Sequence, residues 1–318
     1  MTQPPDGDGA SIDVLMATYN GERFIAEQIE SILRQSHQDW KLTVRDDRST
    51  DGTCAVVRDY ARRHPDRIVA QERGENSGSA EQNFFEMLLE STARHVMLCD
   101  QDDLWLDDKI ALTVGRMAEL EHRFGADTPV LVHTDLTVTD ASLRVTARSM
   151  MQAQQLDGRE SRLARLVTQN TVTGCTVMVN RALVDMVRGP FDAVVMHDWW
   201  LAMIASAFGA IGFVDTPTVL YRQHGTNAVG ARPSRSLSYK VNRLLDKEGV
   251  TRSLRDSFAQ AEVFLERFEG RLSAEQADML RAFTSIPRLG KAGRLRVLRR
   301  YGFWKNTVVR RLGQVLYV

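Results

Sequence analysis

Acidic and polar residues directly follow three short apolar runs early in the sequence. The groups are Thr18-Tyr19-Asn20, Asp46-Asp47 and Asp100 to Asp103. Carboxylates gathered in one place repel one another unless a cation or a donor-rich ligand lies among them. Capping of the next helix would explain Asp107 and Asp46, but it does not easily explain so many acidic groups at once. The pattern therefore predicts a ligand site, with a cation or a donor-rich ligand among the carboxylates.

The apolar runs before these groups have the length of β-strands. We predict strands over 12–17, 40–45, 68–72 and 95–99, with amphipathic helices between them, as where Ile25, Ile29 and Ile32 share one face. This alternation is typical of an α/β fold with a parallel sheet and crossover helices. Ligands of such sheets bind beyond the carboxyl ends of the strands, so the polar groups should meet at one edge.

The second half of the chain predicts further strands over 130–138, 171–179 and 219–222, and a helix over 159–169. The run from Trp199 to Val214 has no charged residue and could be mistaken for a membrane span. A spanning helix needs about 20 apolar residues. Because this run is shorter and is divided by Gly209 and Gly212, we predict a buried helix followed by a strand.

Charge is unevenly distributed along the 318 residues, which carry 41 basic and 41 acidic side chains. From residue 231 on there are 19 Lys and Arg but only 8 Asp and Glu, so a basic tail of net charge +11 follows an acidic body of −11. Such a tail is expected to meet an anionic surface, either a membrane or nucleic acid. The composition is that of a globular protein. The three cysteines are widely spaced, which favours buried thiols in a reducing compartment.

Six motifs in a fixed order carry a resemblance to a known family. They are Ala17-Thr18-Tyr19-Asn20-Gly21, Arg45-Asp46-Asp47-Arg48-Ser49-Thr50-Asp51-Gly52-Thr53, Asp100-Gln101-Asp102-Asp103-Leu104-Trp105, Asn170-Thr171-Val172-Thr173-Gly174-Cys175, His197-Asp198-Trp199-Trp200 and Tyr221-Arg222-Gln223-His224-Gly225-Thr226-Asn227. With these motifs the chain resembles the family 2 glycosyltransferases of the GT-A fold. Among them it looks most like the bacterial rhamnosyltransferases of rhamnan and O-antigen synthesis.

The resemblance implies a division of the chain into three parts. Residues 1–10 would be a disordered lead. Residues 11–232 would form the GT-A catalytic domain, an α/β domain with a Rossmann-like, mostly parallel central sheet and flanking helices. Residues 233–318 would form a basic amphipathic helical extension.

A nucleotide diphosphate sugar is the donor that the resemblance implies, dTDP-rhamnose first and a UDP-sugar otherwise. Asp47, by family position, would accept the imide N–H of the base, while Tyr19 offers a face for stacking and Thr18 a hydroxyl. Packing as a strand-end aromatic is the alternative for Tyr19. The residues implied in nucleotide binding are Thr18, Tyr19, Asn20, Glu22, Asp46, Asp47, Asn76, Asn83 and Asp100.

Asp100-Gln101-Asp102 has the DxD pattern of a divalent-metal site. Positions i and i+2 of an extended segment point to the same side, so both carboxylates can face one ion. A hard cation, Mg²⁺ or Mn²⁺, would neutralise the diphosphate as it leaves. His224 resembles the histidine that follows the last strand in many GT-A enzymes and touches the metal or diphosphate, although a lone histidine is as often structural. The implied metal ligands are Asp100, Asp102 and His224.

Asp198 is the general base that the resemblance implies. In an inverting transfer, a carboxylate takes the proton of the acceptor hydroxyl as that hydroxyl attacks the anomeric carbon. The alternative for Asp198 is a helix N-cap. The tryptophans beside it could frame the sugar, although core packing is equally compatible with one of them. The residues implied near the acceptor and the sugar are Asp103, Trp105, Gly174, Cys175, His197, Trp199, Trp200 and Arg222.

The last 34 residues contain nine Lys and Arg and no acidic residue, and they flank an apolar stripe from Leu298 to Val315 that includes Trp304. A basic amphipathic helix of this kind favours the interface of an anionic membrane, which suits a polyprenyl-linked glycan acceptor. A stripe packed on the catalytic domain, or a homodimer contact, is the alternative.

The expected function is an inverting, metal-dependent glycosyltransferase that acts at the inner, cytoplasmic face of the cell membrane. A non-catalytic nucleotide-sugar or glycan binding module on the same fold is the alternative. Nucleic-acid binding is not expected because the first 230 residues are acidic and the tail has an apolar stripe. A nicotinamide enzyme is not expected either, because no GxGxxG follows the first strand.

Overall fold

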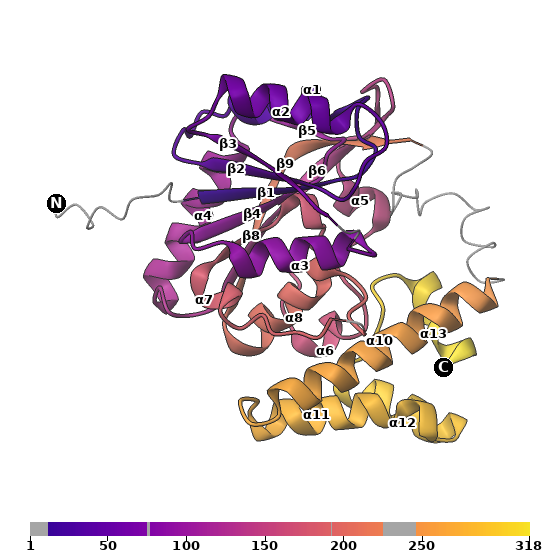
Figure 1. The fold of residues 1–318 in the computed structure, drawn as a ribbon. Coiled ribbons are helices and arrows are strands. Elements are labelled where there is room, and N and C mark those ends of the chain that lie inside the picture. The colour runs from indigo at the N-terminus through magenta and orange to yellow at the C-terminus, as the bar shows by residue number, and fades with distance from the viewer. Residues whose placement is uncertain (1–11, 75–76, 192, 225–245) are drawn as a thin grey trace.

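The computed structural model describes residues 12–74, 77–191, 193–224 and 246–318. The lead at 1–10 and the boundary between residues 232 and 233 lie outside these ranges. The described residues form a central β-sheet with helices on both faces and a group of C-terminal helices below it (Figure 1).

The sheet has nine strands in the order β3-β2-β1-β4-β8-β6-β9-β5, with β7 paired to β6. The four strands β1 to β4 are parallel, β6 is parallel to β9, and β8 runs antiparallel between β4 and β6. The strands are β1 (Ile12–Thr18), β2 (Lys41–Asp46), β3 (Ile68–Glu72), β4 (His95–Cys99), β5 (Leu104–Trp105), β6 (Val130–Asp140), β7 (Val145–Ala147), β8 (Met178–Asn180) and β9 (Ala210–Gln223).

Helices cover both faces of the sheet because the central strands are apolar on both sides. In β1, Val14 and Met16 pack toward α1, whereas Leu15 packs toward α3 and α8. The helices of this part are α1 (Ile25–Leu33), α2 (Thr53–Arg63), α3 (Ala80–Glu90), α4 (Lys109–Phe124), α5 (Met150–Gln154), α6 (Leu163–Leu166), α7 (Arg181–Val184) and α8 (His197–Phe208). The predicted α/β class, with a largely parallel sheet, is confirmed.

Two predicted elements differ from the structure. The helix predicted over 159–169 is reduced to α6, because the Glu160 carboxylate accepts hydrogen bonds from the backbone N–H and the guanidinium of Arg162 and so competes with helix formation before Leu163. The strand predicted over 171–179 is replaced by a 3₁₀ turn, η1 (Gly174–Thr176), and the short β8.

The uncharged run from Trp199 to Val214 is α8 followed by the start of β9, as predicted. Gly209 ends the helix where the chain passes Pro129 so closely that a Cβ atom would lie 1.8 Å from the Pro129 carbonyl oxygen. In the part of the chain that the structure describes, no helix is both long and apolar enough to cross a membrane.

Within residues 246–318, the C-terminal extension forms four helices: α10 (Lys247–Phe268), α11 (Ala274–Ser285), α12 (Lys291–Tyr301) and α13 (Val308–Tyr317), with the 3₁₀ turn η2 (Ile286–Arg288) between α11 and α12. Their apolar faces share one core with α8, where the Trp200 ring meets Phe264 edge-on at 5.2 Å between centroids. The extension therefore packs on the catalytic part, which was one of the alternatives.

The apolar stripe predicted from Leu298 to Val315 is not one continuous helix. Helix α12 ends at Tyr301, because Gly302 takes a left-handed φ of 73°. Helix α13 begins anew, with the Thr307 hydroxyl capping the N–H of Arg310. Leu298 is buried in the core, so the first half of the stripe is not available to a membrane.

Candidate active site

The loops after β1 and β2 are fastened to each other by side chains that were expected to bind the nucleotide. Asn20, with a φ of 48°, accepts a hydrogen bond from the Thr50 N–H through its side-chain oxygen (2.8 Å). Glu22 accepts one from the Gly52 N–H (2.9 Å). These polar groups are used within the protein, so Asn20 and Glu22 shape the donor side of the site by holding its two loops together.

Asp46 and Asp47 have different surroundings. Asp46 is buried and accepts hydrogen bonds from the Thr18 hydroxyl (2.9 Å) and from the N–H and hydroxyl of Ser49. Asp47 accepts from the N–H and hydroxyl of Ser77, at 2.7 and 2.8 Å, and lies 3.7 Å from the Arg73 guanidinium. Asp46 thus braces the turn after β2, and Asp47 connects that turn to the loop after β3.

Asn83 and Asn76 were also expected to contact the nucleotide. Asn83 is buried on α3 and reaches the Arg45 carbonyl at 3.5 Å, beneath the end of β2. Asn76 lies outside the described residues.

Tyr19 is the exposed aromatic at the end of β1, with 53% of its surface accessible. Its backbone is held by Gln101, which accepts from the Tyr19 N–H (2.9 Å) and donates to the Tyr19 carbonyl (3.0 Å). Sequence reasoning missed Gln101, because its contact with Tyr19 joins residues 82 positions apart. It joins the end of β1 to the segment after β4 and leaves the Tyr19 ring free.

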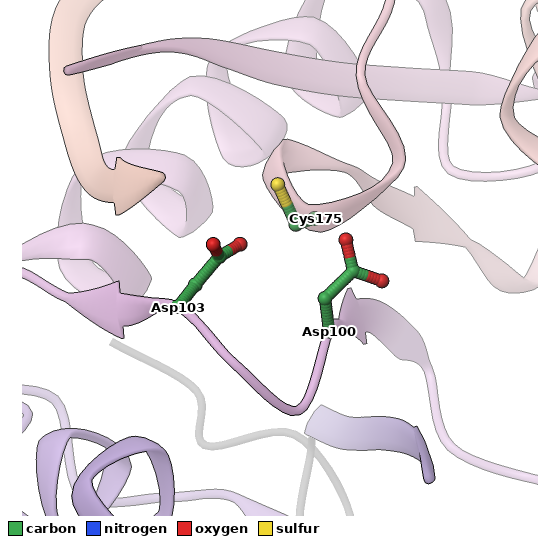
Figure 2. Close-up of side chains that lie close together, drawn as sticks. All are labelled: Asp100, Asp103 and Cys175. Carbon is green, nitrogen blue, oxygen red and sulfur yellow. The ribbon is translucent and has the colours of Figure 1, made fainter. Parts of the chain in front are cut away.

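Asp100, Asp103 and Cys175 come together behind this edge of the sheet. One ligand atom from each lies within 4.8 Å of the other two, and Figure 2 shows the two carboxylates on one loop facing the thiol on the η1 turn. Burial, together with the charges of Asp102 and Asp198, raises the pKa of Asp100 to about 7. Burial also raises the pKa of Asp103 well above its ordinary range. Such pKa shifts are expected where carboxylates are buried close to one another.

Asp102 turns toward His224 instead. The imidazole Nε2 lies 2.7 Å from a carboxylate oxygen of Asp102, and the ring packs on Phe24 with centroids 4.8 Å apart. The residues expected to hold a metal are therefore arranged as an Asp102–His224 pair, with Asp100 close enough to Asp102 for their charges to interact. Carboxylate oxygens and an imidazole are suitable ligands for a divalent cation. Among the described residues, however, the possible ligand atoms that lie together are those of Asp100, Asp103 and Cys175, so the set of Asp100, Asp102 and His224 stays a prediction.

Lys109 is a second residue that sequence reasoning missed. Its side chain is fully buried, and its ammonium lies 4.6 Å from the centroid of the Trp105 ring without a hydrogen-bond partner among the described residues. Burial lowers its pKa to about 8, and the charge of Asp103 opposes that change. Lys109 is thus a positive charge behind the acidic cluster. A lysine at the start of a helix gives no such signal in the sequence.

Arg222 holds the acidic loop in place, which is a different role from the predicted contact with the sugar. Its guanidinium is buried and donates to the carbonyls of Asp102 (2.9 Å) and Ala141 (3.1 Å) and to the Glu27 carboxylate (2.5 Å). Its own N–H donates to Asp103 at 3.0 Å. Each guanidinium nitrogen donates a hydrogen bond within the protein. Arg222 is therefore a positioning residue that joins β9 to the loop after β4.

We expect Arg222→Leu to lower the unfolding free energy by about 2–4 kcal/mol, because it leaves buried acceptors without a donor. It should also weaken Mn²⁺ binding, since the Asp102 backbone loses its support. Denaturant unfolding and a Mn²⁺ titration measure the two effects. Arg116→Leu, which removes a surface ion pair with Glu119, is the control and should change stability by less than about 0.5 kcal/mol. Unchanged stability with a raised acceptor KM would restore the sugar contact.

Asp198 lies in the first turn of α8, where Met196 is the N-cap, so the N-cap alternative is wrong. Its carboxylate accepts from the Asn170 amide (3.1 Å), the Trp199 N–H (2.6 Å) and the backbone of Gly174. Burial nevertheless raises its pKa to about 7. A buried carboxylate that is fixed by several donors and titrates near neutrality is suited to act as a general base. Asn170 was part of a recognised motif but had not been assigned this orienting contact.

The aromatic residues around Asp198 are core residues. Trp105 and Trp200 have no accessible surface, and the indole N–H of Trp199 donates to the Leu166 carbonyl at 2.5 Å. The expectation that these tryptophans contact the sugar is therefore not met for Trp105 and Trp200, because the packing of β9 and α10 encloses them. Asp103 and Cys175 are also buried, so neither can touch an acceptor directly in this arrangement.

His197 packs beneath the same region. Its ring is buried against Phe84, with centroids 4.4 Å apart, and burial lowers its pKa to about 3, so it is neutral. A Cβ atom on Gly174 would lie 2.8 Å from its Nε2. A glycine is therefore required where η1 passes His197, which positions the turn that donates to Asp198.

Known proteins are similar to this chain in sequence and in fold. The dTDP-rhamnosyl transferase RfbG of Shigella flexneri is 26% identical over 244 residues, which cover 71% of this chain and 77% of that protein. The UDP-Glc:alpha-D-GlcNAc-diphosphoundecaprenol beta-1,3-glucosyltransferase WfgD of Escherichia coli is 22% identical over 200 residues, 62% of this chain and 71% of that one. Among solved structures, the mannosyltransferase PcManGT from Pyrobaculum calidifontis, in complex with GDP-Man and Mn²⁺, superposes with a TM-score of 0.52 at 20% identity.

The PcManGT superposition covers 95% of this chain and 77% of that one, which confirms the GT-A-like fold. The model of glycosyl transferase family 2 matches residues 13–183, more than half of the chain and all of the segment from β1 to the acidic loop. This protein belongs to glycosyl transferase family 2.

Proposed function

We propose that this chain is an inverting, metal-dependent transferase that moves L-rhamnose from dTDP-rhamnose to a lipid-linked cell-surface polysaccharide. The observation that carries the reaction type is the position of Asp198. This oriented carboxylate, whose pKa is raised to about 7, is close enough to Asp100 for their charges to interact. A proton acceptor thus lies near the acidic end of the proposed donor site, as a single displacement requires.

In the proposed mechanism, each group of residues has one task. Tyr19 stacks on the base while Asp47 and its Ser77 loop limit the space around it. Asp100, Asp102 and His224 would hold a divalent cation, which neutralises charge on the departing diphosphate. Asp198, held by Asn170, takes the proton of the acceptor hydroxyl as that oxygen bonds to the anomeric carbon. Arg222 keeps the acidic loop in position throughout.

The sugar and the acceptor are supported by similarity to relatives. RfbG, whose match covers 71% of this chain, is named a dTDP-rhamnosyl transferase. WfgD is named for an acceptor linked to diphosphoundecaprenol, a lipid carrier. Such an acceptor would place the enzyme at the inner face of the cell membrane.

The donor is tested by incubating the protein with dTDP-rhamnose, dTDP-glucose, UDP-GlcNAc and GDP-mannose, with and without Mn²⁺. We expect thermal stabilisation and metal-dependent release of the nucleotide diphosphate to be greatest with dTDP-rhamnose. A preference for a UDP- or GDP-sugar would refute the rhamnosyl donor but keep the transferase. Absence of release with every donor, together with binding, would favour the non-catalytic module.

Tyr19→Ala tests the stacking of the base. We expect the donor KM to rise roughly tenfold with kcat little changed, because stacking of an aromatic ring on a base contributes about 1–3 kcal/mol. Tyr19→Phe keeps the ring and is the matched control. Steady-state kinetics with the preferred donor measure the effect. A fall in kcat at unchanged KM would place Tyr19 nearer the chemistry than the base.

A further inference from the structure

Helix α13 carries an exposed apolar stripe although it packs against the protein. Its buried residues are Gly313, which approaches Val250 of α10, and Gln314, which donates to the Phe303 carbonyl (2.7 Å) and accepts from the Lys305 N–H (3.2 Å), and Tyr317 packs on the core. Three of its apolar residues face outward: Val308 is 70%, Leu312 50% and Leu316 60% exposed. Their spacing of four residues puts them on one stripe along the helix.

This exposed stripe, Val308-Leu312-Leu316, lies in a strongly basic segment. Residues 285–318 contain nine basic side chains and no acidic one. Arg296, Arg299, Arg300 and Arg311 are exposed, and none of them forms an ion pair with a carboxylate of the described residues. The Lys291 ammonium donates to the carbonyls of Val315, Leu316 and Val318, which fixes the start of α12 beside the end of α13.

The segment before α13 is connected to the catalytic base. The N–H of Asn306 donates to the Gln169 side chain at 3.0 Å, and the Asn306 side-chain oxygen accepts from Arg165 at 2.7 Å. Asn170, which follows Gln169 in the chain, donates a hydrogen bond to the Asp198 carboxylate. Few residues therefore separate the exposed stripe from the side of the site where the acceptor hydroxyl must approach.

We propose that α13 lies in the surface of a membrane rich in anionic phospholipid, with Val308, Leu312 and Leu316 inserted among the lipids and the arginines of α12 and α13 on the headgroups. A helix with a large apolar face and Arg on its flanks binds this interface without crossing it. Charge complementarity favours this occupant over a second copy of the chain, because two copies would bring their unpaired arginines together. The inference rests on the proposed function only for its purpose, which is to bring Asp198 to a lipid-linked acceptor.

The full-length protein is tested by flotation with vesicles of phosphatidylcholine alone and of equal parts phosphatidylglycerol and phosphatidylcholine, without donor or acceptor. We expect binding to the anionic vesicles, weakened by salt. The variant Val308→Ser/Leu312→Ser/Leu316→Ser should lose binding by roughly tenfold or more. The matched control Leu89→Ser/Leu112→Ser/Val145→Ser replaces exposed apolar residues elsewhere and should bind like the wild type.

A second variant, Arg299→Gln/Arg300→Gln/Arg311→Gln, should bind weakly and lose most of the salt dependence. Hydrolysis of the donor in water should be unchanged in both variants, which shows that they are folded and separates this inference from the proposed function. Equal binding of the apolar variant and the wild type would overturn the proposal. A wild-type dimer that the apolar variant converts to monomer, with no vesicle binding, would also overturn it and assign the stripe to a second copy.

Discussion

Asp198→Asn should lower turnover by roughly 10²–10⁴-fold while donor binding persists, which is the range for loss of a general base. The substitution keeps the shape of the side chain and its acceptor oxygen for Asn170 and the Trp199 N–H, so only proton acceptance is removed. Single-turnover kinetics and donor titration by calorimetry measure the two quantities. Asp127→Asn, an exposed aspartate, is the control.

The pH dependence gives the same prediction a second test. Because the base must be ionised and burial raises the pKa of Asp198 to about 7, kcat/KM should rise tenfold per pH unit below that value and level off above it. A cation at Asp100 favours the ionised form, so the midpoint should fall when metal is saturating. The residual kcat/KM of Asp198→Asn should not show this rise with pH. Turnover equal to that of the wild type would remove Asp198 from the mechanism.

Stability provides a control for folding of the same variant. A carboxyl whose pKa is raised on folding stabilises the fold at low pH, and this contribution is lost as pH rises from about 4 to about 7. Asparagine does not ionise, so the variant does not lose stability in this way. At pH 8 the metal-free variant should therefore unfold at the same temperature as the metal-free wild type or at a higher one. An inactive variant that also unfolds earlier would indicate structural damage rather than loss of a base.

Asp102→Asn should lower turnover by roughly 10²–10³-fold and weaken Mn²⁺ binding, because Asp102 supplies both a carboxylate and the partner of His224. Excess chelator should abolish wild-type turnover, and added Mn²⁺ or Mg²⁺ should restore it. Asp107→Asn changes an exposed aspartate on the same segment and should leave both properties unchanged. Full turnover in chelator would show that the acidic cluster needs no cation.

The sequence predicted the catalytic part of the fold well for a local reason. Strands β1 and β4 are short apolar runs buried on both faces, and polar residues follow each of them, so their bounds are visible without tertiary information. The same local signal gave the polar group after β1 and the acidic groups after β2 and β4. The parallel pairing of these strands then brings the groups to one edge.

What each of those residues contacts depended on segments distant in sequence. Arg222 and Asp103 are 119 residues apart, and only the pairing of β5 with β9 brings them together. Trp200 is a core residue because α10 covers it, which no motif around Asp198 reveals. The sequence alone established the family, the acidic edge and the basic tail. Tertiary structure decided which side chains are free and which are enclosed, since burial is set by packing partners rather than by residue type. Tertiary structure also decided that the exposed apolar face of the tail lies on α13, because Leu298 of α12 is buried.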